Sequence, residues 1–366
     1  MTVPPKKLAI FLPALGGGGA ERVMLKVAQG MVGRGYSVDL VLTQVAGPYL
    51  AEVPHSVRLV DLKASRVLSS LPSLVRYLRR ERPDTLLSGL YANVMALWAR
   101  SLARVPTRVV VSEHNTLSLA VRQATDLRVR LAPQLIKRFY RRADGIIAVS
   151  AGVADDLSRV TGIPRHLIQV IFNPIITPDL RVKSQAPLDH PWFNPGEPPV
   201  ILAAGRLTAQ KDFPTLIKAF ALIQEGRKAR LLILGEGKER PAIEALVKQL
   251  GLEEDVSLPG FVVNPYPYMV RAPVFVLSSR WEGLPTVLVE AMFCGALIIS
   301  TDCPSGPREI LRDGLYGQLV PVGDPVKMAK AIENGLAGKM PHPPEECWKP
   351  FELDRVTDQY INILFG

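Results

Sequence analysis

The chain has 366 residues and a mass of 40.1 kDa, with 48% hydrophobic residues, 21% charged residues and a net charge of +10. This composition excludes wholesale disorder, a collagen-like chain and a coiled coil. The length predicts two domains, each large enough for a hydrophobic core of its own.

The three cysteines, Cys294, Cys303 and Cys347, cannot all pair within the chain, and none stands in a Cys-x-x-Cys motif. The pattern argues against a disulfide scaffold and a thiolate zinc site, and it favours a reducing cytoplasm. No apolar run approaches the ~18 residues of a membrane span, and the N-terminal segment shows no evident signal-peptide cleavage site. We therefore expect a cytoplasmic protein that neither spans a membrane nor is secreted.

The positive charge is concentrated in the first half of the chain. Residues 1–190 contain 26 Lys and Arg against 13 Asp and Glu, whereas residues 191–366 contain 18 against 21. The net charges are therefore +13 and −3, which sum to the +10 of the chain. A cationic half indicates an anionic partner such as phosphate, nucleic acid or anionic lipid. A charge that serves solubility alone is the alternative.

The first half alternates strand-like and helix-like segments. The apolar run 8–12 leads into four glycines, 16–19, and a helical pattern of apolar residues follows over 23–31. Strand, glycine loop and helix in this order open a Rossmann-type unit. Further strand-like runs, each separated from the next by room for a crossover helix, are 37–42, 85–88, 108–112 and 145–150. This alternation predicts a parallel sheet with helices on both faces.

The periodic pattern stops over the proline-rich residues 174–198, which we assign to a linker between a first domain, 1–173, and a second domain, 199–345. The second domain repeats the pattern, with a helix predicted at 285–294. Its strand-like runs are 200–204, 231–234, 256–258, 274–277 and 297–300. The segment 346–366 is predicted to be helical and to pack back toward the first domain. The predicted class is α/β, with two facing Rossmann-like domains of parallel strands and a cleft at the carboxyl ends of those strands.

Two glutamates flank the start of the helix predicted in the second domain. Glu282 stands in the loop before Pro285, which suits a first helical turn, and Glu290 stands more than a turn inside the helix. The amide groups of Thr286 and Val287 would point out of the helix start, where a phosphate can bind. Eight helical residues span about 12 Å, which exceeds the separation of a hydrolytic carboxylate pair. We interpret the glutamates as two acceptors for hydroxyl groups of a nucleotide sugar.

Two cations follow the first strand of the second domain. Gly205 ends the apolar run, and Arg206 and Lys211 lie in the loop behind it. A guanidinium and an ammonium group at this point can neutralise a diphosphate leaving group as its charge develops. The sequence contains no Asp-x-Asp, so a diphosphate carried by Mg²⁺ or Mn²⁺ is not supported. We expect neither a metal site nor another cofactor.

Together these motifs resemble the retaining GT-B glycosyltransferases of family 4. The resemblance covers nearly the whole chain, and its motifs are Gly18-Gly19-Ala20-Glu21-Arg22, Ser112-Glu113-His114-Asn115, Gly205-Arg206 with Lys211, Gly235-Glu236-Gly237, and Glu282 through Glu290. Within the family the chain looks most like bacterial enzymes that extend lipid-linked or cell-surface glycans, including N-acetylgalactosaminyltransferases acting on polyprenyl diphosphate oligosaccharides. The resemblance implies transfer of a hexose or N-acetylhexosamine from a nucleotide sugar, which we expect to be UDP-linked, to a glycan or lipid-linked acceptor. It also implies retention at the anomeric carbon without a metal ion.

The resemblance further implies roles for single residues. Arg206 and Lys211 would bind the donor diphosphate, Glu290 would accept from the ribose hydroxyls and Glu282 would face the transferred sugar. His114 would lie near the reacting sugar or the acceptor, so the predicted catalytic set is His114, Glu282, Arg206 and Lys211. The predicted donor-binding set adds glycines that allow a close approach, the backbone at the helix start and one residue of the base pocket. It consists of Gly18, Gly19, Gly205, Arg206, Lys211, Gly235, Val262, Glu282, Gly283, Leu284, Pro285, Thr286, Val287 and Glu290.

Basic and apolar residues are mixed over 71–82 and 121–142. Helices of this kind suit the surface of an anionic membrane, although their apolar faces could equally pack on the sheet of the first domain. We hypothesise peripheral docking on the inner face of the cytoplasmic membrane, beside a lipid-linked acceptor. Nucleic acid is not an expected partner, because no stripe of stacking aromatics accompanies the basic residues.

Other functions compete with the transferase. A nicotinamide dehydrogenase is disfavoured because Glu21 stands where the third glycine of Gly-x-Gly-x-x-Gly should fall. A sugar-nucleotide epimerase shares the GT-B architecture and is the closest enzyme alternative. A non-catalytic protein that binds an anionic ligand stays open as well.

Overall fold

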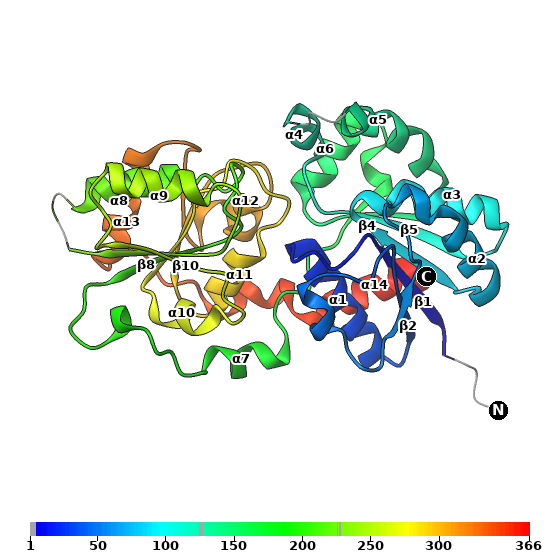
Figure 1. The fold of residues 1–366 in the computed structure, drawn as a ribbon, viewed down its shortest axis with the longest axis horizontal. Coiled ribbons are helices and arrows are strands. Elements are labelled where there is room, and N and C mark those ends of the chain that lie inside the picture. Colours follow the sequence, from blue (N-terminus) through cyan, green and yellow to red (C-terminus); the bar gives the residue numbers. More distant parts are fainter. Residues whose placement is uncertain (1–4, 124–126, 225, 227) are drawn as a thin grey trace. The chain divides into compact units, whose positions relative to one another are not determined.

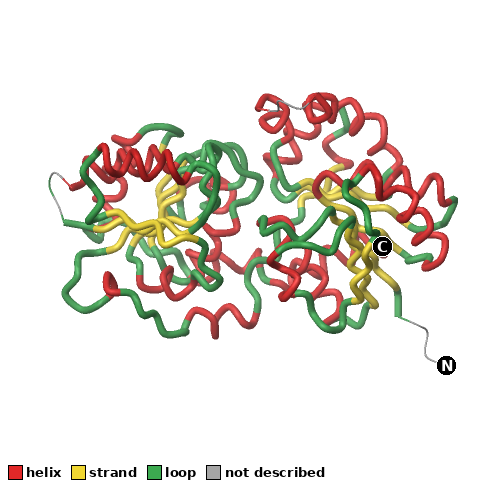
Figure 2. The backbone as a smooth tube through the Cα atoms, viewed as in Figure 1, coloured by secondary structure: helices red, strands yellow, loops and turns green. Residues whose placement is uncertain are grey.

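The computed structural model describes the backbone of residues 5–123, 127–224, 226 and 228–366, and the side chains of residues 123–131 lie outside its description. The chain divides into two compact units, Met1–Ile175 together with Phe351–Gly366, and Ile176–Pro350. Each unit contains one sheet with helices on both faces (Figures 1 and 2). The segment 174–198, expected to be a linker, contains two short helices and falls in the second unit from Ile176 onward.

The first unit is built on a parallel sheet. Its strands are β1 (Lys7–Leu12), β2 (Ser37–Leu42), β3 (Arg58–Asp61), β4 (Thr85–Gly89), β5 (Arg108–Glu113), β6 (Gly145–Ala148) and β7 (Ile168–Val170). In the described residues their order is β3-β2-β1-β4-β5-β6-β7, and every neighbouring pair is parallel. Since β1 lies between β2 and β4, the chain order reverses direction at β1 and leaves a crevice beyond the carboxyl ends of β1 and β4.

The helices of the first unit include one from the end of the chain. The α-helices are α1 (Gly19–Gly33), α2 (Leu71–Glu81), α3 (Asn93–Ala103), α4 (Leu117–Gln123), α5 (Leu127–Phe139), α6 (Ala151–Thr161) and α14 (Leu353–Phe365). Short 3-10 helices are η1 (Pro48–Glu52), η2 (Leu68–Ser70), η3 (Leu90–Ala92), η4 (Tyr140–Arg142) and η5 (Arg165–Leu167). Helix α14 shares a hydrophobic core with β1 and α1 through Val356, Tyr360 and Leu364. A Cβ on Gly30 of α1 would lie 2.1 Å from Thr357 Oγ1, so glycine allows the two helices to touch.

A network of charged residues links β1, β2 and β3 in the first sheet. The buried Asp39 of β2 accepts hydrogen bonds from Arg58 at 2.8 Å and from the Tyr77 hydroxyl at 2.6 Å, and Lys7 Nζ lies 3.1 Å away. Burial opposes ionisation of Asp39, but the hydrogen bonds from Arg58, Tyr77 and Lys7 outweigh it and lower the pKa of the carboxyl. The network therefore stabilises the ionised carboxylate in the folded state.

The second unit repeats the architecture. Its strands are β8 (Val200–Ala204), β9 (Arg230–Leu234), β10 (Val256–Gly260), β11 (Val274–Leu277), β12 (Leu297–Thr301) and β13 (Gln318–Val320). Its helices are α7 (Pro178–Ser184), η6 (Pro191–Phe193), α8 (Phe213–Gln224), α9 (Arg240–Gln249), α10 (Tyr266–Arg271), α11 (Thr286–Phe293), α12 (Pro307–Ile310), η7 (Arg312–Gly314), α13 (Pro325–Leu336) and η8 (Glu345–Phe351), whose last residue belongs to the first unit. Among the described residues the sheet order is β10-β9-β8-β11-β12-β13, and all pairs are parallel. The second reversal of chain order therefore lies between β8 and β11.

The predicted parallel sheets are confirmed, and three strands were missed. The apolar runs predicted as strands 37–42 and 200–204 have the bounds observed for β2 and β8. The missed strands β3, β7 and β13 have only four, three and three residues. All three lie at an edge of their sheets, and the side chains of β3 are also mostly exposed. A strand this short does not produce the long apolar run that marks a central strand.

Candidate functional site

The residues predicted to bind the diphosphate and the transferred sugar lie together at the carboxyl ends of β8 and β11. The loop after β8 contains Arg206 and Lys211, and the loop after β11 contains Glu282. These strands are direct neighbours in the sheet, with Val274 in register with Ile201. Two loops 71 residues apart in sequence thus come together at the point where a doubly wound sheet binds its ligands.

A buried ion pair is the centre of this site. Lys211 Nζ donates a hydrogen bond of 2.6 Å to Glu282 Oε1, and the Ser279 hydroxyl donates another of 2.6 Å to the same oxygen. The side chains of Lys211 and Glu282 are 15% and 9% exposed. Because both groups are largely withdrawn from water, each depends on the other for its charge to be tolerated.

Hydrogen bonds also fix the backbone of both Lys211 and Glu282. The amide of Glu282 donates to the carbonyl of Pro304 at 2.7 Å, and the amide of Ser305 donates back to the carbonyl of Glu282 at 3.0 Å. The Ser278 hydroxyl donates to the carbonyl of Lys211 at 2.7 Å. The loop after β12 therefore takes part in holding Glu282.

The side chain of Arg206, unlike that of Lys211, forms no ion pair with another described residue. Its side chain is exposed, and its guanidinium has no hydrogen-bond or ion-pair partner among the residues that the structure describes. Arg280, two residues before Glu282, pairs instead with the buried Asp212 at 3.1 Å. Of the two predicted diphosphate ligands, Arg206 is thus available to an incoming anion, whereas Lys211 already holds a carboxylate.

The glycine after β9, Gly235, is required by backbone packing. Gly235 has φ +144°, and a Cβ on it would lie 2.0 Å from the carbonyl oxygen of Gly205. The Gly235 amide donates to the carbonyl of Gly260 at 2.8 Å, which brings the loop after β10 alongside. The partly buried Val262 follows in that loop. These contacts explain Gly235 without a ligand.

Helix α11 begins one residue later than predicted. Thr286 is its first residue, and Pro285 is the cap residue before it, with an extended backbone. Gly283 and Leu284 form the approach to the helix. The amides of Thr286 and Val287 lie in the first turn, where a helix offers no internal acceptor for them. This shift by one residue leaves the predicted anion-binding amides at the helix start.

Glu290 is held by a residue that the sequence did not single out. It lies on α11 and is 5% exposed, and the buried Tyr266 hydroxyl of α10 donates to its Oε1 at 3.2 Å. Tyr266 lies in the run Asn264-Pro265-Tyr266-Pro267, which contains no motif that points to a site. Only the packing of α10 against α11 reveals the pair.

His114 lies at the carboxyl end of the first unit's sheet, directly after β5. The side chain is buried, its Nε2 lies 3.1 Å from the Ser112 hydroxyl, and its Nδ1 has no hydrogen-bond partner among the described residues. Burial lowers the pKa of His114 to about 4. The imidazole is therefore neutral at physiological pH and can donate or accept one hydrogen bond at its unused nitrogen.

The predicted glycines of the first unit lie at the start of α1. Gly18 is the cap residue, and a Cβ there would approach only the side-chain carboxylate of Glu21. Gly19 is the first helical residue, and nothing lies within 4 Å of the place its Cβ would take. No packing in the described residues demands glycine at Gly19, so a close approach by a ligand stays the prediction for it.

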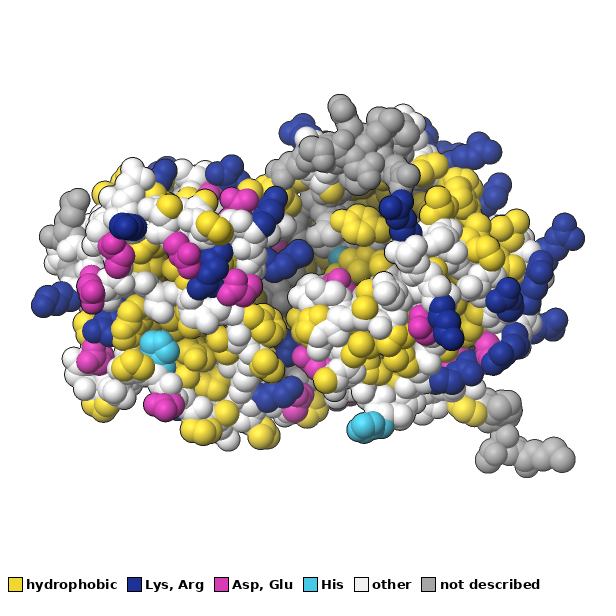
Figure 3. Space-filling model, in the orientation of Figure 1, with side chains coloured by type: hydrophobic (Ala, Val, Ile, Leu, Met, Phe, Trp, Pro, Cys, Tyr) yellow, Lys and Arg dark blue, Asp and Glu magenta, His cyan; other side chains and the backbone are white. Residues whose placement is uncertain are grey.

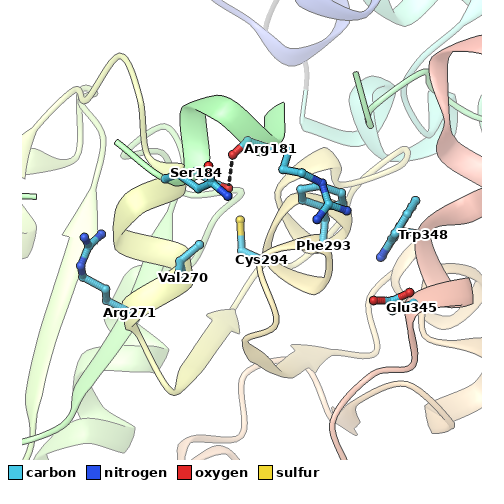
Figure 4. Close-up of a pocket in the computed structure, with 9 residues that line it drawn as sticks. Arg181, Ser184, Val270, Arg271, Phe293, Cys294, Glu345 and Trp348 are labelled. Carbon is cyan, nitrogen blue, oxygen red and sulfur yellow. Dashed lines mark hydrogen bonds between the residues drawn. The ribbon is translucent and has the colours of Figure 1, made fainter. Parts of the chain in front are cut away.

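A separate pocket in the second unit has a volume of about 520 Å³ and contains none of the predicted residues. It is formed by α7, α10, the last residues of α11 and η8 (Figure 4). The Arg181 guanidinium lies 5.8 Å from the centre of the Phe293 ring, and the rings of Phe293 and Trp348 meet edge-on at 5.1 Å. Since the pocket adjoins the end of α11 and the predicted anion site adjoins its start, the two are distinct.

Within the described part of the chain, no group of three or more His, Cys, Asp or Glu side chains is arranged to hold a metal ion. No described helix is long and apolar enough to cross a bilayer.

Two family profiles match the chain, one in each unit. Residues 17–177 match the profile described as Glycosyltransferase Family 4, and residues 198–337 match the one described as Glycosyl transferases group 1. A relative from Campylobacter jejuni, N-acetylgalactosamine-N,N'-diacetylbacillosaminyl-diphospho-undecaprenol 4-alpha-N-acetylgalactosaminyltransferase, is 32% identical over 342 residues, 90% of either chain. The lipopolysaccharide core biosynthesis glycosyltransferase LpsE of Rhizobium meliloti is 28% identical over 359 residues, 95% of this chain and 96% of its own.

Solved structures share the fold. The lipopolysaccharide outer core galactosyltransferase WaaB in its apo form has a TM-score of 0.73 at 21% identity, with 98% of this chain and 99% of that chain covered. HepE from Anabaena in complex with UDP-glucose has a TM-score of 0.74 at 20% identity, with 98% and 97% covered. The architecture expected from the sequence is confirmed. The chain is a glycosyltransferase of the GT-B fold and belongs to glycosyltransferase family 4.

Proposed function

We propose that the protein transfers a hexose or N-acetylhexosamine from a UDP-sugar to a lipid-linked or cell-surface glycan, with retention at the anomeric carbon and without a metal ion. The second unit binds the donor and the first unit presents the acceptor. The observation that carries the proposal is the Lys211–Glu282 pair at the meeting point of β8 and β11, with the free guanidinium of Arg206 on the same loop. The Campylobacter relative, whose name specifies a diphospho-undecaprenol glycan acceptor, supports the acceptor class.

Donor binding would place the diphosphate against cations and amides. Arg206 offers a planar fork of donors, and Thr286 and Val287 offer amides at a helix start. The Lys211 ammonium has three hydrogens and can donate to a phosphate oxygen while keeping a hydrogen bond to Glu282. These groups stabilise the negative charge that grows on the leaving diphosphate, which is the role that a bound metal ion has in other enzymes.

The two glutamates would bind the two sugars of the donor. Glu282, fixed by Lys211 and Ser279, would accept from a hydroxyl of the transferred sugar. Glu290, oriented by Tyr266, would accept from the ribose hydroxyls. In the first unit, the neutral His114 would hydrogen-bond the reacting sugar or the acceptor through a ring nitrogen. No covalent intermediate is needed if the acceptor hydroxyl attacks from the face that the diphosphate leaves.

A donor screen tests the reaction. The purified protein is incubated with UDP-, GDP-, ADP- and dTDP-sugars and an undecaprenyl diphosphate oligosaccharide, and the products are read by mass spectrometry and by NMR of the anomeric proton. We expect transfer from a UDP-sugar, an α-linked product from an α-linked donor and the same rate in EDTA. An inverted linkage or a rate restored only by Mg²⁺ contradicts those parts of the proposal. An epimerised donor without transfer contradicts all of it.

We also propose that the enzyme docks on the cytoplasmic face of an anionic membrane through the first unit. A shallow groove between α2 and α3 combines Leu71, Val75 and Leu102 with the exposed Arg76 and Arg80. Lys and Arg side chains stand out along this edge of the first unit (Figure 3). Apolar residues beside guanidinium groups suit the boundary between lipid headgroups and acyl chains, where each cation contributes about 1 kcal/mol. In the second basic segment, 121–142, the side chains of Arg128 and Arg130 lie outside the described residues.

Vesicle flotation tests the docking. We expect binding to liposomes that contain an anionic phospholipid at low salt, release as the salt concentration rises, and no binding to purely zwitterionic vesicles. The variant Arg76→Glu/Arg80→Glu should reduce binding at least fivefold. Arg79 is kept unchanged because its guanidinium donates to the carbonyl of Leu102 at 2.9 Å and caps α3. Equal binding to both kinds of vesicle would contradict an electrostatic docking surface.

A further inference from the structure

Three polar side chains, two of them buried and one half-buried, form a network directly before His114. They are Glu113, the last residue of β5, Asn93, the first residue of α3, and Tyr140 of η4. Asn93 and Tyr140 are 2% and 1% exposed. The network joins three elements at the point where the chain leaves the sheet and enters the loop that contains His114.

The hydrogen bonds form a closed triangle. The Tyr140 hydroxyl donates to Glu113 Oε1. Asn93 Nδ2 approaches the same carboxyl oxygen at 3.2 Å and the Tyr140 oxygen at 2.9 Å. Asn93 Nδ2 also donates to the backbone carbonyl of Ser112 at 3.0 Å, and the Ser112 hydroxyl lies 3.1 Å from His114 Nε2. A continuous chain of contacts therefore leads from Glu113 to the imidazole ring.

The carboxyl of Glu113 lacks a cationic partner. No ion pair to it occurs among the described residues, and burial raises its pKa to about 7 despite the hydrogen bonds from Tyr140 and Asn93. A carboxyl in this setting is costly compared with an apolar residue of the same size. Glu113 directly precedes His114, which belongs to the predicted catalytic set. This position indicates that the carboxyl is retained for the function of the site, although it does not favour the stability of the sheet.

We propose that Glu113 is a positioning residue, which fixes the backbone of Ser112 and the ring of His114 through Asn93 and Tyr140. It does not contact the substrate, since successive residues at the end of a strand point to opposite faces. The inference rests on the proposed function, because it needs His114 to take part in transfer. It extends that function by assigning a role to the glutamate of the Ser112-Glu113-His114-Asn115 motif.

Three variants separate positioning from bulk stability. Glu113→Ala removes the acceptor of both hydrogen bonds, and we expect kcat to fall at least tenfold while the KM for the donor stays within threefold. Glu113→Gln keeps an acceptor oxygen in the same place, and we expect it to restore kcat to within threefold of the wild type. Tyr140→Phe removes only the hydroxyl and keeps the packing of the ring, so it tests the network even if Glu113→Ala fails to fold.

A double-mutant cycle with His114→Ala decides the case. In the His114→Ala background, Glu113→Ala and Tyr140→Phe should each change kcat by less than twofold, because the residue they position is gone. An equal loss of kcat in both backgrounds overturns the proposal, and so does wild-type kcat in His114→Ala or in Glu113→Ala.

A measurement without turnover distinguishes this proposal from the proposed function. The ring ¹⁵N resonances of His114, assigned by their absence in His114→Ala, should move or broaden in Glu113→Ala and stay in place in Glu113→Gln. If the wild-type protein transfers no sugar, the proposed function fails, and this spectrum still reports on the positioning. Unchanged resonances in Glu113→Ala overturn the proposal in either case.

Discussion

Lys211→Met tests the centre of the proposed donor site, because it removes the ammonium group and keeps most of the side-chain length. The loss of one preorganised donor to a developing negative charge costs about 2.7–4 kcal/mol, or about 10²–10³ in kcat. Arg206 remains and can compensate in part, so we expect kcat to fall at least tenfold. Lys218→Met is the matched control, since Lys218 is exposed on α8 and loses the same charge.

The same substitution perturbs stability for a separate reason. Glu282 keeps its hydrogen bond from Ser279 but loses its counter-ion at 2.6 Å. Removing one partner of a buried ion pair destabilises a protein by about 3 kcal/mol or more. The double variant Lys211→Met/Glu282→Gln removes both charges and should recover a large part of that loss. Its kcat should stay as low as that of the single variant, because neither charge is available to the donor.

The assay measures initial rates at saturating donor together with thermal unfolding, all on folded protein below the melting temperature. Activity that falls only as far as the folded fraction falls would show that Lys211 is structural. A kcat within threefold of the Lys218→Met control would refute the assignment of Lys211 to the leaving diphosphate. Recovery of activity in the double variant would refute it as well.

Tyr266→Phe should raise the KM for the donor about two- to tenfold with little change in kcat, because it removes one hydrogen bond worth about 0.5–1.5 kcal/mol from Glu290; steady-state kinetics check this. Asp39→Asn should destabilise the protein by about 1–3 kcal/mol at pH 7 in urea unfolding, because it weakens the hydrogen bonds that the buried carboxylate accepts. Since the folded pKa of Asp39 is lowered, the wild-type advantage is present above the unfolded pKa of about 4 and is lost as the pH falls below it. Gly30→Ala should cost about 1–3 kcal/mol in the same assay through the clash with Thr357, although the same change in an exposed helix stabilises.

The central strands could be predicted because parallel strands covered on both faces consist almost entirely of apolar residues. The run 200–204 is buried at every position and has the observed bounds of β8. The strand β3 alternates too little and is too exposed to give that signal, although it pairs with β2 over four residues. The order of the strands was not available from periodicity. It follows from right-handed crossovers and from which apolar faces meet after the chain has folded.

The sequence predicted which residues form the candidate site, but it did not predict which of them contact one another. A cation after β8 and a glutamate before α11 are visible in the sequence, whereas their contact depends on β8 lying beside β11. Ser279 and Tyr266 orient the two glutamates through single hydroxyl groups, and a hydroxyl in a loop or a short helix has no sequence signature of its own. Sequence motifs identified the groups that could bind a donor, and packing determined which of them support one another.

Glycine at Gly235 and glycine at Gly19 have different physical explanations. A side chain on Gly235 would meet the carbonyl oxygen of Gly205 at 2.0 Å, so the sheet itself demands glycine there whether or not a donor binds. Gly19 has open space where its Cβ would be, and a helix would be more stable with alanine at that position. A residue that lowers helix stability and relieves no clash within its own unit is better explained by what approaches it from outside. Gly19 is therefore the motif glycine for which the approach of a ligand stays the prediction, and the Gly235 loop informs mainly about the fold.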